Sequence, residues 1–339
     1  MARSAVLGLP RIGPDRELKF ALESHWAGRT DAATLHATAR GLRGASWRSA
    51  QAAGLDTIPS GDFSLYDQVL DTAWALGVVP PRYGAPDRGD LGQYFALARG
   101  DDARRPLELT KWFDTNYHHL VPELTADQAF ALDPRHWVGQ FEEALALGVR
   151  TRPVAIGPFT FLSLSKGIDR PLDLLPRLAP VYGELIGALA RAGARELQID
   201  EPALVRDHAR GDLDAFAAAW RTLADAAREH GVELTLATYF AGLDAVGALE
   251  PAIALRPDEL HLDLVRAPEQ LEPALAALAA LDADPAGHAP SGERPARTRL
   301  SLGVVDGRNV WATDLDAALA LVDRATTALG GERVTVAAS

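Results

Sequence analysis

Short apolar runs alternate with longer helical stretches along the whole chain. Each run is followed by glycine, proline, aspartate or asparagine, and then by an alanine- and leucine-rich stretch with helical spacing, such as Leu172–Ala192, Leu213–His230 and Leu315–Leu329. This alternation predicts a parallel β-sheet, because parallel strands are usually joined through a helix. The strand candidates are Ala5–Pro10, Thr57–Ser60, Leu107–Trp112, Pro153–Ile156, Glu196–Ile199, Glu233–Ala237, Glu259–Leu264, Arg299–Val304 and Arg333–Ala337.

The strand candidates are almost purely apolar, which indicates burial on both faces of the sheet. An open doubly wound sheet and a closed barrel both fit this pattern. Nine candidates for eight places favour a (β/α)8 TIM barrel with an extra strand at one end of the chain, since open sheets of this size are less usual. Such barrels typically take about 250 residues, and more with insertions. We therefore expect a single α/β domain over residues 1–339.

One segment, residues 283–297, departs from the alternation because it is dense in proline and glycine. That composition cannot hold a helix or a strand. We expect a flexible surface loop ahead of the strand at Arg299. A domain linker is the alternative, but too little chain follows it to build a second domain.

Composition excludes several classes of function. The chain is 47% hydrophobic and 24% charged, as in ordinary soluble enzymes. Its net charge of −12 argues against nucleic-acid and anionic-membrane binding. The absence of cysteine excludes disulfides, thiolate metal sites and thiol nucleophiles, and fits a cytoplasmic protein. Neither a signal peptide nor an apolar run long enough for a membrane span is evident.

Polar residues follow nearly every strand candidate, where the working face of a parallel barrel is expected. Only three of the 34 basic residues are lysines, and all three, Lys19, Lys111 and Lys166, lie in this position. A lysine is a compact cation that suits carboxylate or phosphate groups. Helix caps and loop ion pairs are the alternative roles for such residues. The others are Arg11, Arg16, Asp62, Asp67, Asp114, Asn116, His118, Thr160, Thr238, Tyr239, Asp263, Arg266, Asp306, Arg308 and Asn309.

Two further groupings of titratable residues are candidates for chemistry. Asp200 and Glu201 are adjacent at a strand end, so their side chains point to opposite faces and cannot form an inward acid/base pair. One inward carboxylate that orients a polar ligand, or a structural pair with arginine, fits better. His118–His119 and His261-x-Asp263 offer too few ligands for a metal, which needs three or four. Hydrolase, nucleotide and dinucleotide motifs are absent from the sequence.

Seven sequence blocks resemble one enzyme family, the cobalamin-independent methionine synthases. They occur in the family's order and span nearly the whole chain. The first reads Leu-Gly-Leu-Pro-Arg-Ile-Gly-Pro-Asp-Arg-Glu-Leu-Lys-Phe from Leu7, and the third reads Thr-Lys-Trp-Phe-Asp-Thr-Asn-Tyr-His from Thr110. The others are Gly61–Asp71, Gly157–Phe161, Gln198–Leu204, Leu260–Glu269 and Leu302–Asn309.

The resemblance implies a fold and an activity. Members of the family have two face-to-face barrels and transfer the methyl group of 5-methyltetrahydropteroyl-polyglutamate to homocysteine. A zinc ion held by histidine, cysteine and glutamate of the C-terminal barrel binds the homocysteine sulfur. This chain resembles the N-terminal barrel only. The resemblance therefore implies no catalytic residue, no zinc ligand and no cofactor in this chain, and no methyl transfer by the chain alone.

The resemblance also places binding residues. The matching family positions contact the polyglutamate tail of the folate, and a polyanionic tail would pair with cations through charge-assisted bonds. Among them Glu17 would orient a cation rather than touch the tail. The expected substrate-binding residues are Arg16, Glu17, Leu18, Lys19, Lys111 and Asn116.

The partners expected from this resemblance are the folate polyglutamate and the C-terminal zinc barrel of the same enzyme. Two alternatives remain open at this point. The chain could be a non-catalytic barrel that docks a separate C-terminal protein, in which case an exposed apolar patch is expected. It could instead be an independent barrel enzyme using Asp62, Asp200 and Glu201, in which case a self-contained polar pocket with a perturbed carboxylate is expected.

Overall fold

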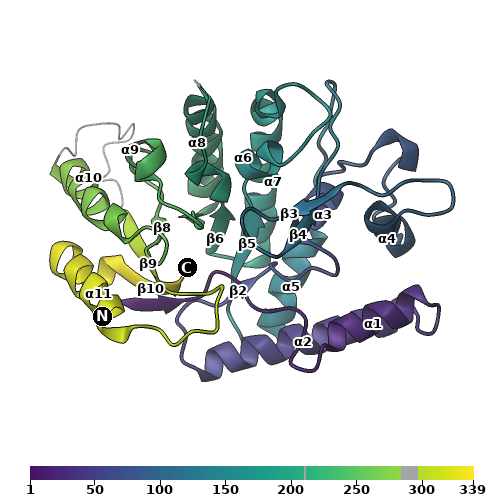
Figure 1. Ribbon diagram of the computed structural model, residues 1–339, viewed down its shortest axis with the longest axis horizontal. Helices are drawn as coiled ribbons and strands as arrows, with labels where there is room; N and C mark the ends of the chain where they lie inside the picture. Colours follow the sequence, from purple (N-terminus) through teal and green to yellow (C-terminus); the bar gives the residue numbers. More distant parts are fainter. Residues whose placement is uncertain (210, 284–296) are drawn as a thin grey trace.

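The computed structural model describes residues 1–209, 211–283 and 297–339. Eight parallel strands form one sheet in the order β1-β10-β9-β8-β7-β6-β5-β2. Its two edges meet, because Ala5 forms a parallel bridge with Thr57 and the Thr57 N–H donates to the Ser4 carbonyl at 3.0 Å. The predicted (β/α)8 barrel is confirmed (Figure 1). The ring strands are β1 (Arg3–Ala5), β2 (Pro59–Ser60), β5 (Arg152–Ile156), β6 (Glu196–Asp200), β7 (Glu233–Ala237), β8 (Glu259–Asp263), β9 (Arg299–Val305) and β10 (Val334–Ala338).

The ninth strand candidate lies outside the ring, but it is internal to the chain and not terminal as expected. The run Leu107–Trp112 forms β3 (Leu109–Lys111), which pairs antiparallel with β4 (His118–Leu120). All three β3 residues are exposed, whereas a ring strand is covered on both faces. The two terminal strands β1 and β10 instead pair with each other and belong to the ring. The first candidate run also began too late, since only its Ala5 lies in β1.

Helices surround the ring, as Figure 1 shows, with α1 and α2 along the lower edge of the view and α4 at the right. The stretches with helical spacing fold as predicted into α7, α8 and α11. The helices are α1 (Glu17–Trp26), α2 (Ala32–Ala52), α3 (Gln68–Ala75), α4 (Leu91–Arg99), α5 (Arg135–Ala146), α6 (Pro158–Ser163), α7 (Leu175–Ala192), α8 (Asp212–His230), α9 (Leu249–Ala254), α10 (Leu271–Ala283) and α11 (Leu315–Leu329). Single 3₁₀ turns are η1 (Pro81–Tyr83), η2 (Pro171–Leu174), η3 (Pro202–Val205), η4 (Asp244–Val246), η5 (Pro268–Gln270) and η6 (Gly331–Arg333).

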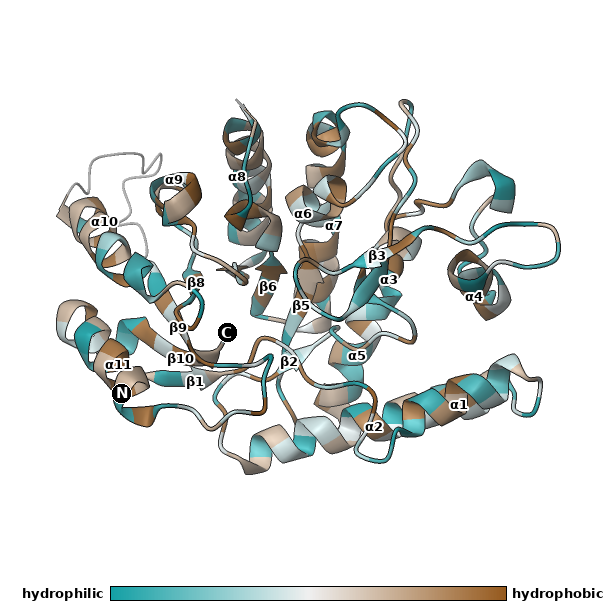
Figure 2. Ribbon diagram, viewed as in Figure 1, coloured by the Kyte–Doolittle hydropathy of each residue, from teal (hydrophilic) through white to brown (hydrophobic). Residues whose placement is uncertain are grey.

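The main apolar core fills the space between the strands and the helices. The ring strands contribute alternate apolar side chains to it, such as Leu197 and Ile199 of β6, and Figure 2 shows helices of mixed apolar and polar character around the strands. The largest fully buried side chains in this layer include Trp220, Tyr182, Phe141 and Phe159. The helices therefore attach through one apolar face each, as amphipathic spacing predicts. The loop expected over 283–297 lies, apart from its two end residues, outside the described residues.

Candidate functional site

Asp200, the last residue of β6, is the inward carboxylate of the Asp200–Glu201 pair. Its Oδ1 accepts a hydrogen bond from Gln198 Nε2 at 2.7 Å, and its Oδ2 accepts one from the Tyr239 hydroxyl at 3.0 Å. Burial raises the pKa of Asp200 to about 7, and these two donors oppose the rise. The side chain stays part-exposed at the C-terminal end of the ring, where ligands bind to parallel barrels.

Glu201 points the opposite way, as strand alternation requires. Its carboxylate is fully buried and accepts from the backbone N–H groups of Phe159 at 3.1 Å and Thr160 at 2.6 Å, at the start of α6. Burial raises the pKa of Glu201 to about 8, against the effect of these hydrogen bonds. A Cβ on Gly157 would lie 2.1 Å from Glu201 Oε1, so glycine is needed there for close approach. Glu201 is therefore a helix cap.

A polar network inside the barrel supports Asp200 from below. Arg152 Nη2 donates to Gln198 Oε1 at 2.7 Å, and Arg152 Nη1 donates to Glu259 Oε1 at 2.8 Å. Thr335 donates to the other oxygen of Glu259 at 2.8 Å. Because Gln198 in turn donates to Asp200, this network fixes the orientation of the carboxylate at the mouth.

The first predicted binding block lies at the start of α1. Arg16 is exposed and precedes the helix with a left-handed backbone, φ 62°. Lys19 is exposed and pairs loosely with Glu23 at 3.7 Å. Glu17 accepts from the Asp15 N–H at 3.1 Å. Leu18 is fully buried, so its side chain packs in the core and only its backbone can face a ligand.

The second predicted block lies on the β3–β4 hairpin. Lys111 and Asn116 are both exposed, and Lys111 forms no ion pair with any described residue. The hairpin turn between them reaches the opposite side of the ring. Asp114 pairs there with Arg266, which follows β8, and with Arg308, which follows β9. The hairpin therefore spans the barrel mouth.

The two predicted blocks are not joined to each other in the part of the chain that the structure describes. No hydrogen bond or ion pair links Arg16 or Lys19 with Lys111 or Asn116, and Figure 1 shows α1 below the β3–β4 hairpin. The third lysine, Lys166, is already paired, since its amine lies 2.5 Å from Glu108 Oε2. Lys111 is thus the lysine whose charge stays uncompensated by a described carboxylate.

Several other polar residues of the predicted ring proved to be structural. Asp67 caps α3 by accepting from Val69 and Leu70 N–H, and burial raises its pKa to about 7. Asp62 accepts from the Leu9 N–H at 2.6 Å. The carboxylate of Asp263 accepts three backbone N–H groups. The cap interpretation therefore holds for Asp67, whereas Asp62 and Asp263 hold the backbone of loops at the mouth. No local sequence pattern indicated that Asp114 would meet arginines far along the chain.

The histidines considered as metal ligands do not converge. Among the described residues no group of three or more histidines and carboxylates could hold a metal ion. His261 Nδ1 lies 2.9 Å from Ser301 Oγ, and burial lowers its pKa to about 3. His119 is buried, and both its ring nitrogens lack a described hydrogen-bond partner. Within the described ranges, no helix is long and apolar enough to cross a membrane.

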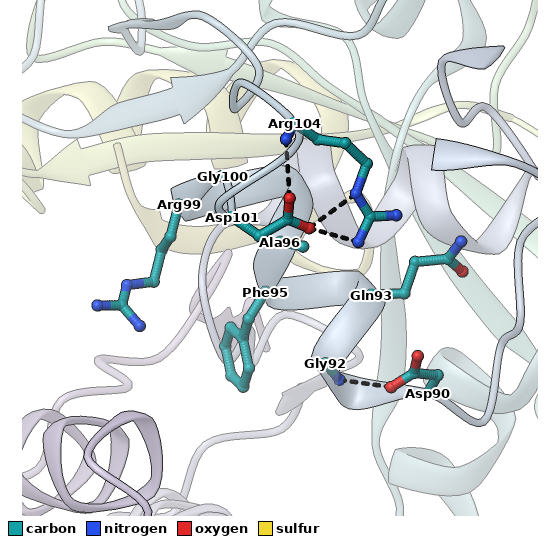
Figure 3. Close-up of a pocket in the computed structure, with 9 residues that line it drawn as sticks. All are labelled: Asp90, Gly92, Gln93, Phe95, Ala96, Arg99, Gly100, Asp101 and Arg104. Carbon is teal, nitrogen blue, oxygen red and sulfur yellow. Dashed lines mark hydrogen bonds and ion pairs between the residues drawn. The ribbon is translucent and has the colours of Figure 1, made fainter. Parts of the chain in front are cut away.

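Two cavities lie away from the mouth. One, of about 320 Å³, opens beside α4, and Figure 3 shows the Asp101–Arg104 ion pair on its wall. The other, of about 530 Å³, lies on the outer side of α7 and α8 and includes Glu184 and His230. Neither contains a predicted binding residue. We place the candidate site at the mouth, because the inward carboxylate Asp200 lies there and the hairpin that carries Lys111 crosses it.

A parallel (β/α)8 barrel with a hairpin across its mouth is the class of protein that fold and site define. A family model described as "Cobalamin-independent synthase, N-terminal domain" matches residues 3–330. The chain belongs to this family.

Curated relatives agree. The 5-methyltetrahydropteroyltriglutamate–homocysteine methyltransferase of Xylella fastidiosa (strain M23) is 49% identical over 340 residues, which cover 98% of this chain and 42% of the relative. The enzyme of that name from Parvibaculum lavamentivorans is 47% identical, covering 100% of this chain and 43% of the relative. The chain thus spans less than half the length of these relatives.

Solved structures share the fold. The putative vitamin-B12 independent methionine synthase from Listeria monocytogenes superimposes with a TM-score of 0.64 at 14% identity, covering 100% of this chain and 91% of that one. A B12-independent methionine synthase from Shewanella sp. W3-18-1 gives a TM-score of 0.63 at 14% identity, covering 91% and 82%. At this identity the likeness concerns the barrel fold alone.

Proposed function

We propose that this chain is the tail-binding half of a 5-methyltetrahydropteroyltriglutamate–homocysteine methyltransferase. It would hold the polyglutamate tail of the methyl donor and support the barrel that carries out methyl transfer. The observation that carries the proposal is Lys111, an exposed cation at the barrel mouth with no described carboxylate partner. A tail of several carboxylates is the chemistry that such a cation fits.

The α1 block and the hairpin supply the remaining contacts. Arg16 and Lys19 are exposed on the surface and add positive charge in an acidic protein of net charge −12. Asn116 offers an amide that can donate to a carboxylate. Glu17 holds the Asp15 backbone and so shapes the turn that presents Arg16. Leu18 anchors this turn in the core.

Zinc belongs to a part of the enzyme outside this chain in this proposal. The chain has no cysteine, and its described residues hold no cluster of metal ligands. No residue of this chain is therefore assigned a catalytic role. The chain alone is expected to transfer no methyl group to homocysteine.

Calorimetric titration with triglutamylated 5-methyltetrahydrofolate tests the tail-binding role. Lys111→Ala and Lys19→Ala should each weaken binding about 3- to 10-fold, as expected for the loss of one charge-assisted contact. Lys166→Ala is the matched control, because its amine is already engaged by Glu108. Wild-type affinity in Lys111→Ala would overturn the proposal.

A docking role has its own supporting observation, an exposed apolar patch on the loop after β9 and on α11. The loop after β9 and the outer face of α11 expose Val310, Trp311, Leu315 and Leu319, at 97%, 75%, 67% and 55%. Adjacent exposed apolar side chains of this size are typical of a protein interface. We propose that they contact the zinc-binding barrel, whether it is part of the same polypeptide or a separate protein.

Co-sedimentation with the C-terminal part of the Xylella fastidiosa relative, supplied as a separate zinc-loaded polypeptide, tests the docking role. Trp311→Ser/Leu315→Ser should abolish the complex. Leu147→Ser, which alters an exposed leucine at the end of α5, is the control and should leave it intact. A complex that survives the double substitution would refute this use of the patch.

A further inference from the structure

Asp114 lies between two arginines at the barrel mouth. Arg266 Nη2 donates to Asp114 Oδ2 at 3.0 Å. Arg308 Nη1 lies 3.2 Å from both carboxylate oxygens, and Arg308 Nη2 donates to the Asp114 carbonyl at 3.1 Å. One carboxylate thus faces two guanidinium groups, and the cluster of three keeps a net positive charge.

The neighbouring carboxylates do not neutralise this charge by pairing with the guanidinium groups. Asp263 accepts from the backbone N–H groups of Phe240, Val265 and Arg266. Asp306 accepts from the Arg308 and Asn309 N–H groups and from the Asn309 side chain. Both carboxylates are engaged by their own loops, so Asp114 is the described carboxylate that the two guanidinium groups share.

The cluster is open to solvent. The side chains of Arg266, Arg308 and Asp114 are 39%, 28% and 54% exposed. Ion pairs with this exposure contribute little to stability and can be exchanged for another anion. A soluble carboxylate therefore has access to the same guanidinium groups.

The rest of the hairpin tip is attached by aromatic contacts under backbone strain. The rings of Phe113 and Phe240 lie 5.4 Å apart, and Arg206 and Arg308 lie over them at 5.7 and 5.8 Å. Both phenylalanines have positive φ, 51° and 82°, which bulky residues rarely adopt. Such a backbone conformation persists only while tertiary contacts hold it. Residues with this strain are concentrated at ligand clamps and switch regions of proteins.

We infer that Arg266 and Arg308 form a carboxylate-binding site, that Asp114 occupies it in this structure, and that a carboxylate of the polyglutamate tail takes it over. The inference rests on the proposed function for the identity of the ligand. Lys111 lies three positions before Asp114 on the same hairpin, so a tail bound at Lys111 brings further carboxylates close to the two arginines. Displacement of Asp114 then releases the hairpin tip, and contacts between the tail and the two arginines replace the ion pairs of Asp114 across the mouth.

Removal of the internal carboxylate tests the inference on the full chain. The probe is γ-linked triglutamate without the pterin, measured by calorimetry at low salt. Asp114→Asn should raise affinity about 3- to 10-fold, because the competitor for the arginines is gone and the competent state is more populated. Asp114→Ser is the second variant and should behave in the same way. Circular dichroism confirms the fold of each.

Two further variants complete the test, one that removes both arginines and one that serves as a control. Arg266→Gln/Arg308→Gln should lower affinity in the wild type and cancel the gain in Asp114→Asn. Glu272→Gln is the matched control, since Glu272 forms a bidentate pair with Arg324 between α10 and α11. It should leave affinity unchanged. Unchanged or weaker binding in both Asp114 variants overturns the inference.

The same data separate this inference from the proposed function. If triglutamate binding is lost in Lys111→Ala but is unaffected by the substitutions of Asp114, Arg266 and Arg308, the proposed function holds and the inference is wrong. If Asp114→Asn binds triglutamate through the arginines regardless of Lys19 and Lys111, the inference holds and the proposed tail site is wrong. Absence of binding in every variant overturns both.

Discussion

Arg152 and Glu259 form a 2.8 Å ion pair inside the barrel, with side chains only 3% and 2% exposed. The other guanidinium nitrogen, Arg152 Nη2, donates to Gln198 Oε1, and the Gln198 amide donates in turn to Asp200. Residues at the base of the ring thus set the geometry of a carboxylate at its mouth.

Arg152→Met should destabilise the fold by about 3 kcal/mol, because it leaves the buried Glu259 carboxylate with Arg299, 3.5 Å away, as its remaining cationic partner. Urea unfolding measures this loss. Arg152→Met/Glu259→Met should recover much of it, since replacement of a whole buried pair is often neutral or stabilising. A double variant as unstable as the sum of the two single variants would contradict the pairing account.

Gly157→Ala should cost at least about 2 kcal/mol, because the new Cβ would meet the buried Glu201 carboxylate at 2.1 Å and force the cap of α6 apart. Gly139→Ala on α5 is the matched control. Its Cβ would meet nothing within 4 Å, so the alanine should stabilise by up to about 1 kcal/mol through helix propensity. Equal effects at the two glycines, measured by thermal unfolding, would argue against the close approach.

His119 should make the fold sensitive to mild acid. Burial lowers its pKa to about 4 from 6.5, so the folded state favours the neutral ring. Below pH 6.5 the unfolded chain binds a proton first, and stability falls until the pH reaches the folded pKa. His119→Leu should remove a loss on the order of 3 kcal/mol between pH 6.5 and 4. Its unfolding free energy should change little at pH 8.

An unchanged pH dependence of stability in His119→Leu would contradict this role of His119. Because both ring nitrogens lack described partners, leucine deletes no described hydrogen bond and only the T-shaped contact with Trp112. If the variant keeps the wild-type pH dependence, another group must titrate in this range. His261 is the first to examine, since burial lowers its pKa to about 3, so it too favours the unfolded chain in acid.

Much of the fold could be predicted from the sequence because the ring strands carry a local signal. Runs such as Glu233–Ala237 are apolar, bounded by turn residues and flanked by helical spacing. Run Leu107–Trp112 is less apolar, since Glu108, Thr110 and Lys111 interrupt it, and its partner β4 follows at once and pairs with it antiparallel. The spacing of apolar residues characterises one strand but does not say which strand it pairs with. The strand outside the ring was therefore expected at a chain end.

The site could be predicted only as a ring of candidates. Alternation of side chains correctly separated Asp200 from Glu201. Lys111, which was expected after a strand of the ring, lies instead on the hairpin outside the ring. The meeting of Asp114 with Arg266 and Arg308 depends on the path of the hairpin across the mouth, with sequence separations of 152 and 194 residues. No local pattern encodes such a contact.

Recognition of the methyl donor's tail by this barrel is the property to measure first. Calorimetric titration with triglutamylated and monoglutamylated 5-methyltetrahydrofolate, at low and high salt, tests it most directly. The account predicts tighter binding of the triglutamyl form, a difference that shrinks as salt screens the charges, and its loss in Lys19→Ala/Lys111→Ala. Equal affinity for the two forms, or a tail preference that survives the double substitution, would contradict it.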